Sequence, residues 1–524
     1  MDWLFFRARF YMSACPGDVF FIPYRPDTKP DKTKTEEDER VMEAFTELLN
    51  KIDNYVWGIP LIVAILAVGL LLTIRLHGLQ FRKMGLGFKY LFSKESKDKN
   101  GKNTGDVSSF QALCTALSAT IGTGNIVGVA TAIAAGGPGA MFWMWIAALV
   151  GTATKFSECT LAVKYRTQAE DGHIVGGPFY YIENGMGPRW KWLAKIFAFF
   201  GLLVGLWGIG TFSQINGITS AVQGFFDPDM KHPVTIVGVQ LSWVTVIAGL
   251  ILTLLVALVI IGGLKRISSV AEKIVPFMAI VYIAISLIVI FTHLPAIPGA
   301  IVEIVESAFG LRAAAGGALG AMVMAMQKGI ARGIFSNEAG LGSAPIAAAA
   351  AKVDEPVRQG LISMLGTVID TLIICTMTGL TIVLTDAWEI EGLEGVQITT
   401  KAFQIGLPFP EQLSSFLLMV CLIFFAFTTI LGWDYYSERC LDYLTHNSKK
   451  ATSIYRFLYI LCVFIGPYMT VSAVWTIADI VNGLMAIPNL IALVALNGVV
   501  VAEVKKYFSK QKEMKNPGLA AGKS

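Results

Sequence analysis

Long apolar stretches recur along the whole chain, and short polar segments separate them. A helix needs about 20 residues to cross the roughly 30 Å hydrocarbon core of a bilayer. Eleven stretches reach or approach this length: residues 56–76, 108–134, 139–164, 192–224, 236–263, 267–292, 316–350, 357–385, 411–435, 453–470 and 472–503. The pattern predicts an all-α, multi-pass membrane protein with eleven transmembrane helices. Composition agrees, because 54% of residues are hydrophobic, only 15% are charged, and the mean hydropathy is +0.60.

Lysine and arginine gather on one side of the predicted membrane when the connecting segments are taken in alternation. The first segment on that side holds seven of them between Arg82 and Lys102, and the C-terminal tail holds six more from Lys505 onward. Opposite segments hold little beyond Lys51, Lys231, Arg312 and Lys401. The positive-inside rule therefore predicts a plasma (inner) membrane protein whose first helix begins outside and whose C-terminus is cytoplasmic.

The two ends of the chain differ from its apolar body. Residues 1–41 include the charge-dense stretch "RPDTKPDKTKTEEDER" and are predicted to be disordered. An amphipathic lead-in begins at Met42, which makes this residue a candidate for the true start. We expect residues 42–107 to form an N-terminal helix with a basic cytoplasmic loop, and residues 504–524 to form a basic cytoplasmic tail.

Two of the predicted spans are interrupted by glycine and polar residues. The first interruption is "SATIGTGNIV", residues 118–127, and the second is "GIFSNEAGLGSAPIAAAAA", which begins at Gly333. Taken alone, the first is equally compatible with a close helix contact of the Gly-x-x-x-Gly kind. Together they occupy corresponding positions in two sets of five helices, residues 108–292 and 293–503. Paired interruptions of this kind indicate an inverted repeat with a binding site near the membrane midplane.

Three stretches resemble a known family. "GGPGAMFWMWIAALVG", residues 136–151, resembles the signature of the alanine/glycine:cation symporters, which include the sodium:alanine symporters. "ARGIFSNEAGLGSAP" and "GTVIDTLIICTMTGL" are similar to other blocks of that family. The resemblance implies the leucine-transporter-type fold: a 5+5 inverted repeat with one extra N-terminal helix and two helices unwound at midplane. It also implies sodium- or proton-driven uptake of small neutral amino acids, without an enzymatic reaction or an organic cofactor.

The resemblance also implies a substrate site at the two helix breaks. The amides of Thr123 and Gly124 would receive the substrate carboxylate, because free N–H groups at a half-helix start attract anions. Trp433 would cap a pocket for small side chains. For Gln214, an interhelical hydrogen bond is an equally open interpretation. The implied substrate-binding residues are Thr123, Gly124, Asn125, Gln214, Phe335, Ser336, Asn337, Gly340, Thr429 and Trp433.

A sodium site is expected beside the first break. Thr428 and Thr429 stand side by side in "FAFTTILGW", and hydroxyl and carbonyl oxygens suit a hard cation. The alternative is that both threonines bond the carbonyls of their own helix. The ligands implied by the fold's shared sodium site are Ser118, Ile121, Phe425, Thr428 and Thr429. In proton-coupled relatives of the fold a lysine can replace this ion. The corresponding span from Ile274 contains none, so sodium is the expected driving ion.

Several charged residues lie within or beside the spans, where they are costly and usually paired or functional. Lys155 and Glu158 have the spacing of an i,i+3 pair, so we expect a structural ion pair. Lys328, Arg332 and Glu338 approach the second break, where they would form an outer gate or line a wet vestibule. The sequence identifies no partner for Asp370 or Asp479. Under proton coupling, Asp370 and Glu338 are the candidate proton carriers.

Other classes of function find less support. A membrane hydrolase needs a nucleophile with a base, or a metal pair, and the five histidines form no such motif. The seven cysteines show no metal or disulfide spacing. A channel would show repeated pore segments. We therefore predict a sodium-coupled symporter whose partners are membrane lipid and alanine or glycine, with no nucleic acid. Proton coupling, a larger substrate such as glutamine, and the oligomeric state stay open.

Overall fold

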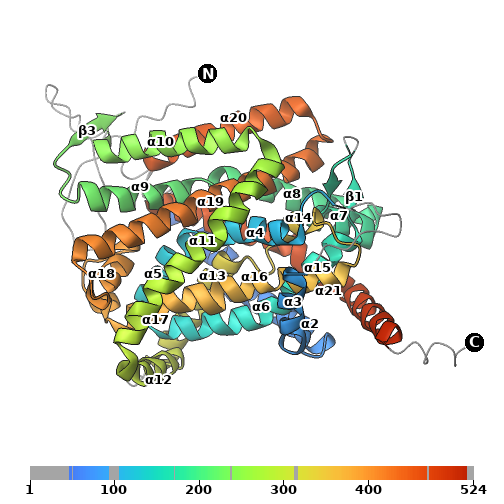
Figure 1. Cartoon of the computed structure of the whole chain (residues 1–524), viewed down its shortest axis with the longest axis horizontal. Coiled ribbons are helices and arrows are strands. Elements are labelled where there is room, and N and C mark those ends of the chain that lie inside the picture. Colours follow the sequence, from blue (N-terminus) through green and yellow to red (C-terminus); the bar gives the residue numbers. More distant parts are fainter. Residues whose placement is uncertain are drawn as a thin grey trace, which may run out of the picture.

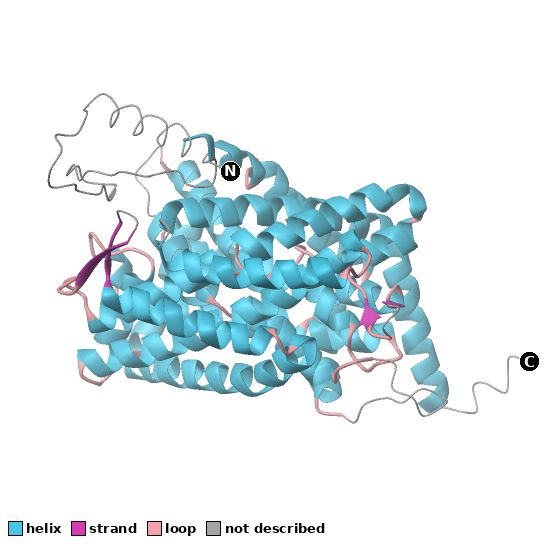
Figure 2. Ribbon diagram, turned by 90° about the horizontal axis from the view of Figure 1, so that it is seen from above, coloured by secondary structure: helices cyan, strands magenta, loops and turns pink. Residues whose placement is uncertain are grey.

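The computed structural model describes residues 47–49, 51–93, 105–169, 172–236, 239–311, 317–468 and 471–515. The predictions of a disordered segment 1–41 and of a start at Met42 lie outside these residues. Most of the described chain is helical, which confirms the all-α class. Long helices lie side by side in similar directions (Figure 1). Two short antiparallel hairpins, β1–β2 and β3–β4, lie toward opposite ends of the bundle (Figure 2).

The α-helices and strands are bounded as follows: α2 (Ile59–Arg75), α3 (Leu79–Leu91), α4 (Ser109–Thr120), α5 (Val129–Gly136), α6 (Gly139–Lys164), β1 (Thr167–Gln168), β2 (Ile174–Val175), α7 (Pro178–Tyr181), α8 (Lys191–Trp207), α9 (Phe212–Phe226), β3 (Pro233–Ile236), β4 (Val239–Ser242), α10 (Trp243–Ile260), α11 (Gly263–Thr292), α12 (Ile297–Ala308), α13 (Ala318–Asn337), α14 (Ala344–Ala349), α15 (Pro356–Ser363), α16 (Leu365–Thr367), α17 (Thr376–Leu384), α18 (Val396–Gly406), α19 (Glu411–Thr445), α20 (Lys449–Ile465) and α21 (Val471–Lys515). Wider π-helical turns are η1 (Gly124–Gly128), η2 (Ile182–Met186) and η5 (Val368–Cys375). Single 3₁₀ turns are η3 (Pro188–Trp190), η4 (Leu294–Ala296), η6 (Ala387–Glu389) and η7 (Gly466–Tyr468).

Among the described residues, nine helices are long and apolar enough to span a membrane. The helices Ser109–Thr120 and Gly124–Gly136, bent by 52° at the break between them, make a tenth if the pair is counted as one span. These nine or ten spans agree with a multi-pass membrane protein, and the predicted eleventh would be the shorter pair α13 and α14. Two helices run further than predicted, since α19 continues to Thr445 and α21 to Lys515. The first part of the predicted basic tail is therefore helical.

Helix α6 lies at the centre of the fold. Most of its residues are buried, and it packs against α13, α14, α15 and α2. Small residues allow this close approach: a Cβ on Gly329 of α13 would lie 2.2 Å from the carbonyl oxygen of Ala140. Such small-residue contacts are the usual way in which membrane helices pack tightly.

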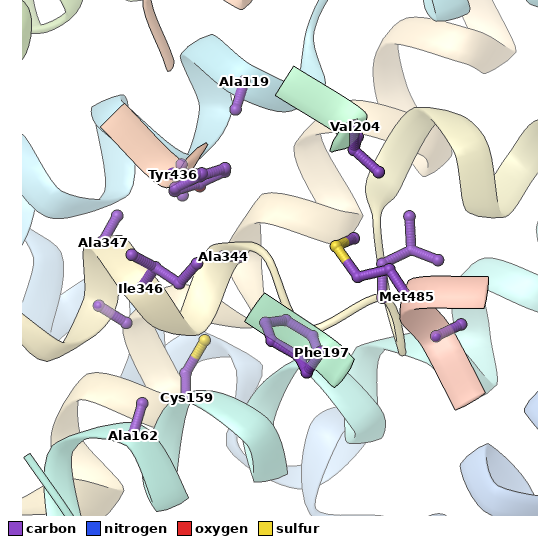
Figure 3. Close-up of a cluster of buried hydrophobic side chains, with 14 of the residues drawn as sticks. Ala119, Cys159, Ala162, Phe197, Val204, Ala344, Ile346, Ala347, Tyr436 and Met485 are labelled. Atoms are coloured by element: carbon purple, nitrogen blue, oxygen red, sulfur yellow. The ribbon is translucent and has the colours of Figure 1, made fainter. Parts of the chain in front are cut away.

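A second centre of packing is α19, which contacts α8, α9, α4 and α11. Between α6 and α19 lies an apolar cluster to which α4, α8, α14 and α21 also contribute side chains (Figure 3). Labelled members of this cluster are Ala119, Cys159, Phe197, Ala344, Tyr436 and Met485. The two interrupted spans are thus held between α6 on one side and α19 on the other.

Candidate functional site

The first helix break begins where α4 ends at Thr120. The Gly122 N–H, which would continue the helix by bonding the Ser118 carbonyl, instead donates to Asn125 Oδ1 at 2.9 Å. The Thr123 N–H donates to Gln214 Oε1 on α9 at 3.0 Å. Gln214 therefore makes an interhelical hydrogen bond, and it takes one of the two amides that the resemblance assigns to the substrate carboxylate. The Ser118 carbonyl is left available as an oxygen ligand.

Glycine is required at the centre of this break. A Cβ on Gly122 would lie 2.5 Å from Thr429 Oγ1 and 2.8 Å from Gln214 Oε1. Gly124 is less confined, because a Cβ there would lie 3.3 Å from the Phe335 ring. The first break is thus packed directly against α19, α9 and the end of α13.

The second break follows Asn337, the last residue of α13. Glu338 ends this helix in the left-handed region, at φ 56°, and Gly340 and Gly342 follow at φ 92° and 84°. Positive φ angles are routine only for glycine, which explains the Gly-rich sequence here. Asn337 holds the turn, because its Oδ1 accepts from the Ala339 N–H at 2.9 Å and its Nδ2 donates to Thr371 Oγ1 at 3.0 Å.

One buried carboxylate joins the two breaks. Asp370, on η5, is fully buried. Its Oδ1 accepts from Asn125 Nδ2 at 2.7 Å, and its Oδ2 accepts from the hydroxyls of Ser336 at 2.8 Å and Thr371 at 2.7 Å. These neutral donors pair its oxygens without cancelling its charge. The fold brings together the first break, the second break and η5. Asn125 and Asp370 are 245 positions apart in the sequence, so the sequence alone could not pair them.

The residues of the expected sodium site lie together next to the first break. The Thr429 hydroxyl is 3.1 Å from the Ile121 carbonyl and 3.1 Å from the Phe425 carbonyl, and the Thr428 hydroxyl is 3.0 Å from the latter. Each threonine bonds carbonyls of its own helix, and Thr429 also bonds the Ile121 carbonyl at the end of α4. The sodium site itself stays a prediction. The side chain that α11 places here is Met278, whose Sδ is 3.6 Å from Thr428 Oγ1.

A further polar group lies on the α6 side of the second break. The predicted pair forms, with Lys155 Nζ 3.9 Å from Glu158 Oε1 in a fully buried position. Asn489 of α21 donates at 2.9 Å both to Glu158 Oε2 and to the Gly340 carbonyl. Glu338 accepts from Ser343. Within the described chain, Lys155 Nζ, Glu158 Oε1 and Glu338 Oε1 have no hydrogen-bond partner.

Asp479 finds its partner in Arg332. Two parallel hydrogen bonds of 2.9 Å join the guanidinium of α13 to the carboxylate of α21. The guanidinium also lies over the rings of Phe335 and Trp475, 5.4 and 5.2 Å from their centroids. Both charged side chains are partly exposed, at 21% and 13%. Lys328 packs its Cβ against Gly136 and takes no part in this pair. Of the predicted gate residues, Arg332 therefore has the geometry of a closure between two helices.

The other predicted site residues are placed less centrally. Gly340 packs against residues of α2, α6 and α21. Trp433 is fully buried, with its ring 5.5 Å from that of Tyr436 and its Cβ against Gly210. Its indole N–H has no hydrogen-bond partner within the described residues. All side chains of the two breaks and of the threonine pair are buried, and the most accessible of them, Thr120 and Val127, are 8% exposed, so the site is closed to solvent in this conformation.

Comparison with known proteins identifies the family to which the chain belongs. The family model of the sodium:alanine symporter family matches residues 42–521. The chain belongs to this family. It is 53% identical over 466 residues to an uncharacterized transporter of Haemophilus influenzae, covering 89% of the chain and 96% of the relative. It is 42% identical to the sodium/alanine symporter AgcS of Methanococcus maripaludis (90% and 99% covered) and 38% identical to the probable sodium/glutamine symporter GlnT of Bacillus subtilis (91% and 93%).

A solved structure supports the fold. The crystal structure of MhsT in complex with L-phenylalanine matches with a TM-score of 0.52 at 13% identity, covering 75% of this chain and 90% of that one. MhsT has the leucine-transporter fold, and the match shows that this chain shares its general architecture. The count of eleven helices and the inverted repeat stay predictions. The chain is an integral membrane protein of an amino-acid transporter family, and not an enzyme.

Proposed function

We propose that the chain carries out sodium-coupled symport of small neutral amino acids by alternating access. The observation that carries this proposal is the pair of helix breaks tied together by Asp370, with a cluster of neutral oxygens beside the first break. Free N–H and C=O groups at helix breaks suit the charged ends of a zwitterion. The inverted repeat of residues 108–292 and 293–503, and the eleventh span α13–α14, belong to this proposal.

The proposed substrate site is the space bounded by the two breaks and α19. The substrate carboxylate would take the Gly124 amide, and the Thr123 amide once Gln214 releases it. The substrate ammonium would face the Phe335 carbonyl and the Ser336 hydroxyl, close to the Asp370 charge. Alanine or glycine is the proposed substrate because bulky buried side chains surround this space and AgcS is a sodium/alanine symporter. Glutamine is the alternative, since GlnT is named for it at similar identity.

Sodium is the proposed coupling ion. The hydroxyl of Thr429 lies 3.1 Å from the carbonyls of Ile121 and Phe425, and the hydroxyl of Thr428 lies 3.0 Å from the Phe425 carbonyl. The Ser118 carbonyl does not accept the Gly122 N–H that would continue its helix. The side chain that α11 brings to this point is a methionine thioether, which carries no charge to replace the ion. A sodium ion bound here and a substrate at the adjacent break would each raise the affinity for the other.

Ion-gradient experiments test the proposal directly. Purified protein is reconstituted in proteoliposomes, and uptake of labelled alanine is measured with an imposed sodium gradient or an imposed proton gradient, one at a time. We expect accumulation with the sodium gradient alone. Accumulation driven by protons in sodium-free buffer would overturn the ion assignment. A panel of unlabelled amino acids tests the substrate, and stronger competition by glutamine than by alanine would favour the alternative.

Truncation of Trp433 tests the size of the substrate site. Because this indole is fully buried and packs against Tyr436 and Gly210 on the helix that bounds the proposed site, Trp433→Ala should weaken alanine uptake and admit bulkier competitors. We expect roughly a tenfold loss of alanine affinity, as is usual when a large buried contact is removed from a site. The matched control is Trp207→Ala, which removes an indole that is 46% exposed. An unchanged competition profile in Trp433→Ala would place the tryptophan outside the site.

The ion pair between Arg332 and Asp479 is expected to act as a gate. Asp479→Arg and Arg332→Asp should each lower alanine uptake roughly tenfold, because each leaves like charges facing one another. The double exchange should restore part of the activity, since the pair can re-form in reverse. Uptake rates of the wild type, the two single variants and the double variant give the coupling energy between Arg332 and Asp479. Asp229→Arg, at an exposed ion pair with Lys231, serves as the control. Additive losses in the double variant would exclude a gating pair.

A further inference from the structure

A basic pocket lies at the opposite end of α2 from the gate. It has a volume of about 570 Å³ and is formed by the turn between α2 and α3 and by the last turns of α21. Four cationic side chains line it: Arg82 and Lys83 from α3, and Lys505 and Lys512 from α21. None of the lining residues is acidic. Nothing in the proposed transport cycle uses this pocket.

The pocket is built from ordered parts of the chain. Its α21 wall is fastened to α3 by two hydrogen bonds to the Tyr90 hydroxyl, from Tyr507 at 2.8 Å and from Gln511 at 2.6 Å. An ion pair of 2.7 Å between Lys510 and Glu355 fastens it to α15. The α2–α3 turn closes sharply because Gly78 adopts φ 63°. The four basic side chains are thus carried by two helices that are hydrogen-bonded to one another.

Among the described residues, none of the four cationic side chains of the pocket forms an ion pair with a carboxylate. Lys83 Nζ lies 5.0 Å from the centroid of the Phe508 ring, a cation–π contact that leaves its positive charge in place. Glu503, which directly precedes the pocket residues Val504 and Lys505 on α21, forms an ion pair with Lys164 instead. Several like charges around one concavity create a potential that attracts an anion with a compact charge.

Apolar side chains determine which anion fits. The pocket floor contains Leu79, Leu86 and Phe508 beside the cations. The neighbouring surface of α2 is apolar and exposed, with Leu70 51% and Ile74 64% accessible, as expected of a helix that faces lipid. A headgroup phosphate in the pocket would therefore have acyl chains running along α2. A free phosphate would leave this apolar surface unused.

We propose that this pocket binds the headgroup of an anionic phospholipid from the leaflet on the basic side of the membrane. Basic pockets between helices at the cytoplasmic face are suited to phosphate-bearing lipids, and each basic side chain near an anionic lipid contributes roughly fivefold to affinity. The pocket does not depend on the identity of the transported ion or substrate, so the inference stands apart from the proposed function.

Native mass spectrometry of the purified protein tests this proposal. The protein is exchanged into equal mixtures of phosphatidylglycerol and phosphatidylcholine, and retained lipids are counted. The pocket variant combines Arg82→Gln, Lys83→Gln, Lys505→Gln and Lys512→Gln. The control variant removes four exposed basic side chains outside the pocket: Lys265→Gln, Arg266→Gln, Lys449→Gln and Lys450→Gln. Thermal melting of both variants verifies folding, and the lipid preference of the wild-type protein needs no variant.

We expect the wild-type protein and the control variant to retain phosphatidylglycerol at least about tenfold over phosphatidylcholine, since two or more cations act together. The pocket variant should lose this preference. Equal retention of both lipids by the wild-type protein would overturn the proposal. So would an unchanged preference in the pocket variant, or an equal loss in the control, which would indicate general charge attraction. Displacement of phosphatidylglycerol by inorganic phosphate at low concentration would assign the pocket to a soluble anion instead.

Discussion

Replacing Thr428 and Thr429 together by valine is expected to raise the sodium concentration for half-maximal alanine uptake by about tenfold or more. The substitution keeps the side-chain shape and removes two hydroxyl oxygens from a cluster that also contains the carbonyls of Ile121 and Phe425. Loss of a buried polar partner costs roughly 1–3 kcal/mol, which corresponds to a factor of about five to a hundred. The measurement is uptake into proteoliposomes at constant pH and varying external sodium.

A matched control separates ion binding from packing. Thr381 and Thr385 are buried threonines of α17 and its C-terminal cap, whose hydroxyls bond carbonyls of the same helical segment. Thr381→Val with Thr385→Val removes the same atoms from an environment without the carbonyl cluster. The sodium requirement of this control should stay within about twofold of the wild-type value, the spread expected of a small change in stability. If the sodium concentration for half-maximal uptake rises equally in both double variants, Thr428 and Thr429 do not form the sodium site.

Asp370→Ala is expected to abolish measurable uptake. The substitution would leave the Asn125 amide and the hydroxyls of Ser336 and Thr371 without their shared acceptor in a fully buried place. Each orphaned group costs roughly 1–3 kcal/mol, so the two helix breaks would lose their fixed relation. Uptake should fall by about a hundredfold or more while the protein still elutes as a folded species from gel filtration.

The variant Asp370→Asn distinguishes two roles of this residue: holding the two helix breaks together by hydrogen bonds, and supplying a negative charge. An asparagine oxygen can still accept from Asn125, and its amide can donate to the two hydroxyl oxygens, so the three contacts can be kept with the two hydroxyl bonds reversed. If Asp370 organises the site, this variant keeps sodium-driven uptake within about tenfold of wild type. Complete loss in Asp370→Asn, with intact folding, would mean that the negative charge itself binds the cation or the substrate ammonium. Loss of a proton-driven component alone would identify Asp370 as a proton carrier.

The general architecture follows from local signals in the sequence. Apolar length identified nine or ten of the eleven predicted spans. The glycines of both breaks identified where the helices are interrupted, because positive φ angles and close contacts leave no choice of residue. Gly122 is the clearest case, since a Cβ there would meet Thr429 and Gln214. These signals are contained within a few residues of chain, so no tertiary information is needed to detect them.

Partnerships across the fold could not be predicted in the same way. The presence of Asp370 and Asp479 within spans marked them as functional or paired, but the partners Asn125 and Arg332 lie 245 and 147 positions away along the chain. The position of Met278 next to Thr428 depends on the rotation of α11 in the bundle. The spacing of residues along the sequence does not reveal the rotation of α11, because packing against other helices determines it.

Helix α21 connects three features that were described separately. It contains Pro488 within its length, and the next residue, Asn489, donates hydrogen bonds to Glu158 and to the Gly340 carbonyl. Asp479 of the gate lies on one side of this point and Lys512 of the basic pocket on the other, some 50 Å apart at 1.5 Å per residue. Asn489 thus fixes α21 to α6 and to the second break at a point between these two ends. If α21 tilts about this residue during transport, we expect the gate and the basic pocket to move together, so that a lipid held in the pocket would change the rate at which the gate opens.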